Sequence, residues 1–323
     1  MALYFYMSDS QDGWRNLARD RFFLNRLQKD DIMLYFYING NAVIIGKNQN
    51  AWKECNLAAM EEDGVQVVRR HTGGGAVFHD KGNLNFSFIM GEQNYDLARQ
   101  MGVIQKALSK IGLKAELSGR NDILVDGRKF SGNAFGMARG MRAHHGTILV
   151  KADLGRLSKY LNVSPKKIQS KGISSVRSRV CNLTEFVPDL TVERMAELLK
   201  EGFREEYGEY ETYAFSPQEA EEVEKIYREQ ASWEWRLGRT PKFDFELDER
   251  FSFGEMQILF TMKSGAVIGV QVFSDALDTE LAGRVQKALL GVRFTAEDLA
   301  GALREDGGQE LLEIADYIAQ YEL

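Results

Sequence analysis

Two short stretches of the sequence gather residue types that could bind and activate an anion. The first, residues 69–80, reads RRHTGGGAVFHD, with three glycines shortly after two arginines. Glycines let a ligand approach the backbone closely, and their amides, together with a guanidinium, can bind phosphate or carboxylate oxygens. Arg69 and Arg70 are adjacent and would face opposite sides of a strand, so one could be solvated while the other faces a pocket. A turn or bulge without a ligand is the alternative.

The glycine stretch fits neither of the common phosphate-binding patterns. No Lys-Ser or Lys-Thr pair follows the glycines, as a P-loop requires. The residues at 76–78 are strand-like, whereas the glycines of a Rossmann fingerprint open a helix. Any phosphate contact would therefore come from a strand–loop–strand element.

The second stretch, residues 118–134, places polar and glycine residues in two expected strands. Asp122 could hold a hard cation such as Mg²⁺, and Asn121 could assist through its side-chain carbonyl. Lys129 could then place a positive charge between a carboxylate and a phosphate. The alternatives are a simple turn at 121–122 and a solvated lysine, because lysine is usually exposed.

Two further groups carry weaker signals. His144 and His145 would face opposite sides of a strand, which makes them a poor metal chelate, so a buried, hydrogen-bonded imidazole is the better interpretation. The segment 165–179 carries five basic residues and no acidic one. Such a loop could close over a nucleotide and exclude water, although an exposed basic loop is the alternative.

The patterns around these residues predict an α+β scaffold that would position them. Apolar runs at 33–37 and 42–45, around an Asn-Gly-Asn sequence, predict a β-hairpin, and 122–125 and 129–134 predict a second one around Asp126-Gly127. Further strands are expected at 65–69, 84–89 and 145–151. Helices are expected at 14–28, 96–111, 154–160, 192–203 and 217–229. We therefore expect a mixed, mostly antiparallel sheet with flanking helices.

The C-terminal part of the sequence predicts a small α+β domain with a separate core. A hairpin is expected from 256–262 and 266–273, followed by helices at 280–290, 296–304 and 310–321. We place a catalytic domain at 1–246 and an accessory domain at 247–323, within the range that 323 residues allow.

Bulk composition excludes several classes of protein. The net charge is −6, so binding to nucleic acid or to an anionic membrane is not expected. The N-terminus lacks the pattern of a secretory signal, and no apolar stretch is long enough to span a bilayer. Only two cysteines occur, Cys55 and Cys181, which fits a reducing cytosol and argues against a disulfide scaffold.

Taken together, the motifs resemble those of lipoate-protein ligase A, in that family's order and over essentially the whole chain. The matching segments are 16–18, 52–56, 69–80, 119–123, 129–134, 144–147, 171–179 and 232–235. The resemblance implies the fold of biotin and lipoate ligases. It also implies an enzyme that activates lipoate with Mg²⁺ and ATP to lipoyl-AMP. The lipoyl group would then pass to a lysine of a lipoyl domain in a 2-oxoacid dehydrogenase E2 subunit, or of glycine-cleavage H protein.

The resemblance also implies roles for individual residues. Lys129 would be the catalytic residue and would touch both the lipoyl carbonyl and the α-phosphate. ATP would contact Arg70, Gly75, Ala76, Val77, Phe78, Asn121, Asp122 and Lys129, with Mg²⁺ at Asp122. Lipoate would contact Leu17, Tyr37, Gly74, Gly75, Lys129 and His145, and Val77 is a further candidate for the apolar slot. The adenylate would be covered by a loop that includes Lys171, Gly172, Arg177 and Arg179.

Three other functions remain open at this stage. An octanoyl or lipoyl transferase of the same fold would use a cysteine thiol and no ATP, but neither cysteine is near Lys129 in sequence. A non-catalytic lipoate-binding module is argued against by the presence of Arg70, Asp122 and Lys129. A biotin ligase is disfavoured by the Lys129 motif and by the whole-chain resemblance.

Overall fold

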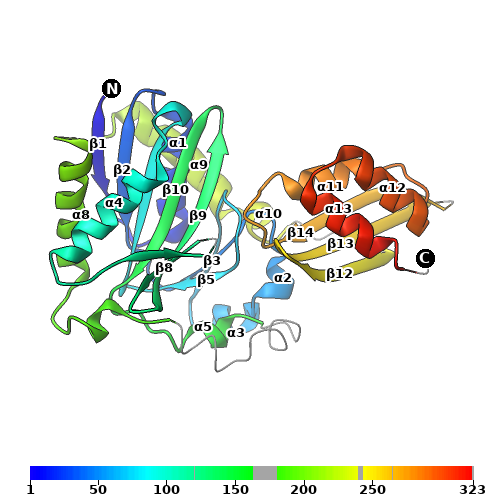
Figure 1. Ribbon diagram of the computed structural model, residues 1–323, viewed down its shortest axis with the longest axis horizontal. Coiled ribbons are helices and arrows are strands. Elements are labelled where there is room, and N and C mark those ends of the chain that lie inside the picture. The colour runs from blue at the N-terminus through cyan, green and yellow to red at the C-terminus, as the bar shows by residue number, and fades with distance from the viewer. Residues whose placement is uncertain (120, 163–179, 239–242, 264, 322–323) are drawn as a thin grey trace.

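The larger part of the chain is built on one eight-stranded sheet (Figure 1). The structure is a computed structural model that describes residues 1–119, 121–162, 180–238, 243–263 and 265–321. Among the described strands of this sheet, only the two pairings of β1, with β11 and β2, are parallel, so the expected mostly antiparallel sheet is confirmed. In spatial order the strands are β11 (Glu211–Thr212), β1 (Leu3–Met7), β2 (Ile32–Tyr37), β6 (Asn83–Gly91), β10 (Met141–Leu149), β9 (Arg128–Ala138), β8 (Asp122–Val125) and β7 (Glu116–Ser118).

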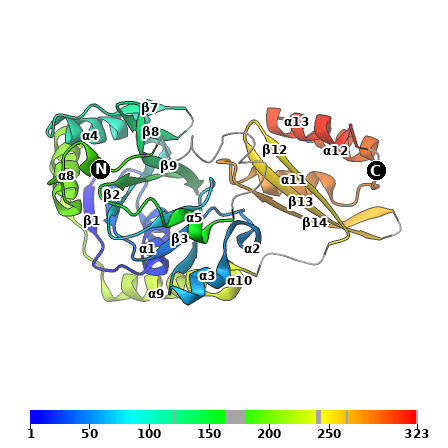
Figure 2. The same ribbon diagram turned by 90° about the horizontal axis from the view of Figure 1, so that it is seen from below.

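Helices cover both faces of this sheet, which is why β2, with the sequence IMLYFY, is buried along its whole length. On one face α4 (Leu97–Ser109) packs against α8 (Val192–Tyr207), and Leu34 and Phe36 of β2 join their core. On the other face α1 (Gly13–Arg26) packs against α9 (Pro217–Ala231), and Tyr35 of β2 joins that core. The two pairs lie on opposite sides of the sheet when the molecule is seen from below (Figure 2).

A second, three-stranded sheet consists of β4 (Gln66–Arg69), β3 (Ala42–Ile45) and β5 (Val77–His79). The predicted hairpin of β2 with β3 is therefore wrong, because the two strands belong to different sheets. In the Asn-Gly-Asn sequence between them, Asn41 is exposed but Asn39 is not. Asn39 is fully buried and its side chain bonds to Asn16 and His79, which anchors the crossing from one sheet to the other.

Two tryptophan side chains protect the carbonyls of β4, which is an edge strand of the small sheet. Trp14 Nε1 donates to the Val67 carbonyl at 2.8 Å, and Trp235 Nε1 donates to the Arg69 carbonyl at 2.9 Å. Trp235 lies in α10 (Trp233–Arg236), so the motif at 232–235 holds the strand that leads into the glycine stretch. The remaining short elements are α2 (Ala51–Glu54), α3 (Leu57–Glu62), η1 (Glu92–Asn94), α5 (Leu157–Tyr160) and η2 (Leu183–Glu185).

The C-terminal residues form a unit with a core of its own. Its antiparallel sheet contains β12 (Phe245–Phe251), β13 (Gly254–Lys263) and β14 (Ala266–Ser274), covered by α11 (Leu281–Leu289), α12 (Ala296–Asp306) and α13 (Gln309–Ile318) (Figure 1). The expected hairpin is the β13–β14 pair. Because β12 begins at Phe245, the boundary proposed at 246/247 falls inside this strand, and the division at that point stays a prediction. None of the described helices is both long and apolar enough to cross a membrane.

Candidate active site

A cavity of about 220 Å³ lies between the large sheet and the small one. One wall is a row of paired residues that crosses four neighbouring strands. Tyr37 of β2 is opposite Asn85 of β6, and Asn85 is opposite Thr147 of β10. Thr147 Oγ1 then accepts a hydrogen bond from the amide of Gly132 in β9 at 3.1 Å. All of these residues line the cavity, so it extends across the strands from Tyr37 to β9.

The other wall comes from α1 and the small sheet. Leu17, Ile44 and Val77 supply an apolar surface, and the glycine stretch supplies backbone. The structure therefore brings together most of the residues that the sequence selected, from segments far apart in the chain. Those that line the cavity are Leu17, Tyr37, Arg70, Gly74, Gly75, Ala76, Val77, Asn121, Lys129 and His145. Gly132 and Asn133, from the stretch at 118–134, also line the cavity. Sequence reasoning assigned no site role to the remaining lining residues, which are Ile44, His79, Asn85, Ala134, Gly146 and Thr147.

Lys129 reaches the cavity because of an irregularity in the β8–β9 hairpin. Ile123 is opposite Ser131 but Leu124 is opposite Lys129, so β9 has one extra residue, Phe130. Residues three apart in a regular strand face opposite sides, whereas a bulge restores the same side. Lys129 and Gly132 consequently both line the cavity, while the Phe130 side chain is buried in the core on the far face.

The ammonium group of Lys129 is held beside a carboxylate. Its Nζ lies 2.7 Å from Asp122 Oδ1, and about a third of each side chain is exposed, which leaves both accessible to a ligand. A side chain at Gly132 would press on Lys129, since its Cβ would lie 3.2 Å from Lys129 Nζ. The absence of a side chain at 132 therefore leaves room for Lys129 over the strand.

Arg70 is the arginine at the cavity, and it is buried. Its guanidinium donates to three backbone carbonyls, those of Ile44, Gly73 and Gly75, at 2.6 to 3.3 Å. Burial lowers the pKa of Arg70 to about 10, so it stays charged at neutral pH. The hydrogen bonds that the described residues make to this buried cation all come from neutral carbonyls, so it attracts an anion to the cavity.

Arg69 is not solvated, contrary to the possibility raised from its position beside Arg70. It is 1% exposed, and its guanidinium donates to the carbonyls of Gly46, Lys47 and Gln49 and to those of α10 at 235–236. These carbonyls satisfy the donors that water would otherwise satisfy. Arg69, at the end of β4, thus fastens the loop that follows β3 to α10 and has a structural role.

The three glycines have different structural requirements. A Cβ on Gly73 would lie 2.5 Å from the Leu277 carbonyl oxygen and closer still to that of Ala276, both in the C-terminal unit. Gly74 has a φ of +94°, which disfavours other residues, and its amide donates to the Ala276 carbonyl at 3.0 Å. Gly75 lines the cavity, and the nearest atom to its Cβ position is 3.9 Å away. The stretch therefore docks the C-terminal unit as well as facing the cavity.

The adjacent histidines face opposite sides of β10, as their spacing predicts. His145 lines the cavity, its Nε2 lies 2.6 Å from Thr72 Oγ1, and its Nδ1 lies 3.6 Å from Asp20. His144 is buried on the other face, where its ring nitrogens contact the side-chain amides of Gln100 and Asn133. Burial lowers the pKa of His144 to about 3, so it is neutral.

Two of the expected ATP contacts, Phe78 and Asp122, do not line the cavity. The Phe78 ring packs on Tyr160, with Arg156 over its face, and any ATP contact of Phe78 stays a prediction. Among the described residues no three His, Cys, Asp or Glu side chains are grouped as metal ligands. Asp122 fits Mg²⁺ as a single carboxylate that shares the ion with phosphate oxygens. The expected covering loop, with Lys171, Gly172, Arg177 and Arg179, lies outside the described residues.

Both cysteines are buried thiols. Cys181 lies beside Lys129 in space although not in sequence, since its amide donates to the Lys129 carbonyl at 2.8 Å. Burial raises the pKa of Cys181 to about 11 and that of Cys55 to about 12. Because the thiolate is the nucleophilic form, neither residue is prepared for attack at neutral pH.

Comparisons with known proteins agree over nearly the whole chain. The family model described as the lipoyl protein ligase A/B catalytic domain matches residues 12–204. The model described as the bacterial lipoate protein ligase C-terminus matches residues 240–318.

Solved structures give the same picture. The structure of P. falciparum LipL1 in complex with lipoate is 30% identical, covers 99% of this chain and 100% of its own, and has a TM-score of 0.86. A bipartite lipoate protein ligase from Thermoplasma acidophilum, described with its E2 lipoyl domain, is 30% identical, with coverage of 76% and 100% and a TM-score of 0.67. A lipoate-protein ligase A bound with ATP is 29% identical, with coverage of 74% and 99% and a TM-score of 0.65.

Proposed function

The chain belongs to the lipoate-protein ligase family, and we propose that it activates free lipoate with ATP to lipoyl-AMP and then transfers the lipoyl group to a protein lysine. One observation carries the proposal. A cavity that extends across the strands from Tyr37 to Lys129 has apolar side chains on one wall and glycine backbone beside them. This arrangement suits an acid with an apolar chain whose carboxylate must meet a phosphate. The lipoate-bound and ATP-bound relatives support it.

In the first step a carboxylate oxygen of lipoate would attack the α-phosphorus of ATP. A new P–O bond forms, the bond to the β-phosphate oxygen breaks, and pyrophosphate leaves with the electron pair. The two reactants are both anions, so a cation between them lowers the barrier electrostatically. Lys129 would supply that charge after leaving Asp122, and the buried charge of Arg70 would favour the phosphates from the opposite wall.

Mg²⁺, when bound, would be held by Asp122 together with phosphate oxygens and would neutralise part of the triphosphate charge. Release of Lys129 from Asp122 would leave that carboxylate available. The glycine backbone at 74–75 would let the reacting groups lie close to the strand–loop–strand element.

In the second step an unprotonated lysine amine of the acceptor would attack the acyl carbonyl. The C–N bond forms, the C–O bond to AMP breaks, and the amine loses a proton. Lys129 would stabilise the negative charge that develops on the carbonyl oxygen. We propose lipoyl domains of 2-oxoacid dehydrogenase E2 subunits and glycine-cleavage H protein as acceptors, and the archaeal relative described with its E2 lipoyl domain supports the first of these.

The thiol-dependent transferase is the alternative function, and the state of the cysteines disfavours it. Cys181 is the thiol nearest to Lys129, but its raised pKa and complete burial leave no thiolate for an acyl intermediate. A lipoate-binding module without activity would have no use for a cation placed between two anions.

An assay of pyrophosphate release with lipoate and ATP tests the proposal. We expect Lys129→Ala to stay folded, because its side chain is partly exposed, and to lose about 10²- to 10³-fold in adenylation rate. Lys287→Ala, an exposed lysine on α11, is the control and should match the wild type. Release at the wild-type rate from folded Lys129→Ala would refute the role of Lys129.

The acceptor is tested by transfer to a panel of lipoyl domains and H proteins, with lipoate or octanoate, with and without ATP. Transfer is expected only with ATP. Transfer from an acyl carrier without ATP would favour the transferase alternative instead.

A further inference from the structure

His79 is a buried residue at the cavity that the proposed chemistry does not use. It is 4% exposed, it lines the cavity, and it lies on β5 of the small sheet. Its ring Nδ1 lies 3.0 Å from the Asn39 amide nitrogen. Its Nε2 is buried and has no hydrogen-bond partner among the described residues. Because Asn39 occupies the Nδ1 edge, the Nε2 edge is the one left for a ligand.

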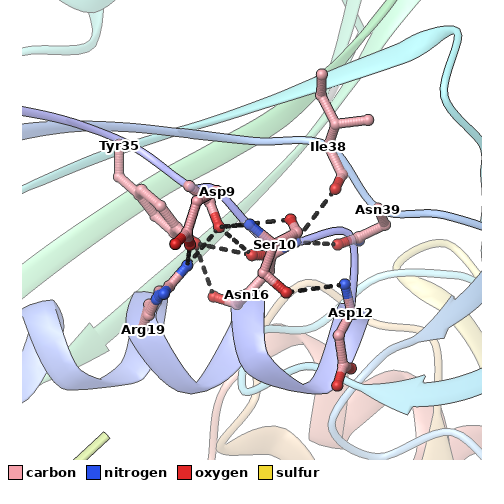
Figure 3. Close-up of polar contacts among 9 residues, drawn as sticks. Asp9, Ser10, Asp12, Asn16, Arg19, Tyr35, Ile38 and Asn39 are labelled. Carbon is pink, nitrogen blue, oxygen red and sulfur yellow. Dashed lines mark hydrogen bonds and ion pairs between the residues drawn. The ribbon is translucent and has the colours of Figure 1, made fainter. Parts of the chain in front are cut away.

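A directional chain of hydrogen bonds determines which nitrogen of His79 carries the proton. Asn16 Nδ2 donates to the carbonyls of Ser10 and Ile38, which are pure acceptors, and also to Asn39 Oδ1 at 2.9 Å. Figure 3 shows Asn16 on α1 with these contacts around it. With its oxygen on Asn16, Asn39 presents its NH₂ group to His79.

His79 Nδ1 must therefore accept, and Nε2 carries the N–H. Burial, together with the nearby charge of Arg70, lowers the pKa of His79 to about 3, so the ring is neutral and has this single N–H. The chain extends toward the surface through Ser8, which donates to Asn16 Oδ1 at 2.5 Å, and Arg19, which donates to Ser8 at 2.6 Å. The protein thus maintains a hydrogen-bond donor at the cavity that it does not satisfy itself.

This donor lies at the end of the cavity remote from Lys129. Asn39 follows Tyr37 by two residues, so His79 is tied to the end of β2. Lys129 is on β9, and β6 and β10 lie between these two strands. Three spacings between strands amount to roughly 14 Å, which accommodates an extended medium-chain acid. With the carboxylate at Lys129, the far end of the acyl chain reaches His79.

We propose that His79 selects acyl chains that end in a hydrogen-bond acceptor, such as the dithiolane sulfurs of lipoate, over hydrocarbon chains of similar length. The proposal rests on the function proposed above and names what discriminates its substrate. A methyl end, as in octanoate, leaves the buried N–H unpaired, and sites built to bond a polar group discriminate against analogues that lack it. Since sulfur is a weak acceptor, we expect the preference for lipoate to be about tenfold in kcat/KM.

The test measures ATP–pyrophosphate exchange with lipoate and with octanoate as alternative substrates. His79→Leu removes the donor, and the lipoate preference should fall about tenfold, mainly because octanoate improves. His79→Gln, whose amide can accept from Asn39 and donate to the ligand, should keep most of the preference. His144→Gln is the matched control, because His144 is equally buried but does not line the cavity, and its lipoate-to-octanoate ratio should equal that of the wild type.

Each outcome decides one of the two proposals. A wild-type enzyme without exchange for either acid would refute the proposed function. Exchange in the wild type with an unchanged ratio in His79→Leu, or an equal loss with both acids, would refute the role of His79 and leave the function intact. Binding of each acid to the free enzyme, measured by calorimetry, gives the same ratio independently of turnover if His79 acts on the ground state.

Discussion

Alanine substitutions in the glycine triplet should separate docking of the C-terminal unit from ligand binding. In Gly73→Ala the new methyl group would lie 2.5 Å from the Leu277 carbonyl oxygen and still closer to that of Ala276. Both contacts are with backbone atoms, which cannot rotate away, so the glycine stretch and the C-terminal unit must move apart. Such overpacking costs about 1 to 3 kcal/mol. The hydrogen bond from Gly74 to Ala276 would be lost as well, at about 1 kcal/mol.

Gly75→Ala is the matched control. Its Cβ position is open, with the nearest atom 3.9 Å away, and its φ is not positive. The free energy of unfolding should therefore change by less than about 0.5 kcal/mol. Gly75 lines the cavity, so its methyl group would occupy ligand space and reduce kcat/KM for adenylation about tenfold or more.

Urea unfolding followed by tryptophan fluorescence measures the stability of both variants, and small-angle scattering measures docking. We expect Gly73→Ala to unfold about 2 to 4 kcal/mol more easily than the wild type and to have a larger radius of gyration. Gly75→Ala should match the wild type in both measurements. A Gly73→Ala variant as stable and as compact as the wild type, or a Gly75→Ala variant that loses equal stability, would refute the reasoning.

Three further predictions follow from buried groups. Cys55→Ala and Cys181→Ala should keep their adenylation activity, and the pH–rate profile should show no step from a thiol. The reason is that burial raises the pKa of Cys55 to about 12 and that of Cys181 to about 11. Loss of activity in a folded variant would count against this prediction. Burial holds the pKa of His144 near 3, below its unfolded value, so this residue contributes stability above about pH 6.5 that is lost as the pH falls toward 3. As the pH falls from about 6.5 to about 3, the free energy of unfolding of the wild type should decrease more steeply than that of His144→Gln, by up to about 1.4 kcal/mol per pH unit. Parallel curves of unfolding free energy against pH would contradict this role of His144. Arg69→Lys loses the hydrogen bonds of the guanidinium to five carbonyls, so it should lower the free energy of unfolding by about 3 kcal/mol. A urea titration measures this change, and an unchanged midpoint would argue against the structural role of Arg69.

Local patterns in the sequence were sufficient for most of the elements. The apolar period predicted α1, α4, α8, α9 and the C-terminal helices within a few residues, and Asp126-Gly127 predicted the β8–β9 turn, where both residues have positive φ. These features depend on the backbone preferences and periodicity of neighbouring residues, which the sequence states directly. Lys129, Arg70 and the glycine stretch were selected because unusual polar residues in expected strands need a purpose. Lys129, Arg70, Gly74 and Gly75 line the cavity, and their roles stay a prediction.

Pairing between distant segments could not be read in the same way. The apolar runs at 33–37 and 42–45 have the pattern of a hairpin, yet they join different sheets because Asn39 is anchored by Asn16 and His79. The strands β1, β7 and β11 were missed because strands of two to five residues have little periodicity of their own. The partner of a strand depends on which other surfaces remain to be covered, and that is a property of the whole fold.

The sequence by itself determined the family, the main helices and strands, and the identity of the charged residues that could perform the chemistry. The tertiary structure decided which way those residues face. An extra residue in β9 turns Lys129 into the cavity, a set of carbonyls makes Arg69 structural, the backbone of the C-terminal unit requires Gly73, and a chain of amides leaves the N–H of His79 unpaired. For Arg69, Gly73 and His79 the deciding atoms come from segments far away in the chain, so no local pattern contains them, and for Lys129 the register of the strand pair decides.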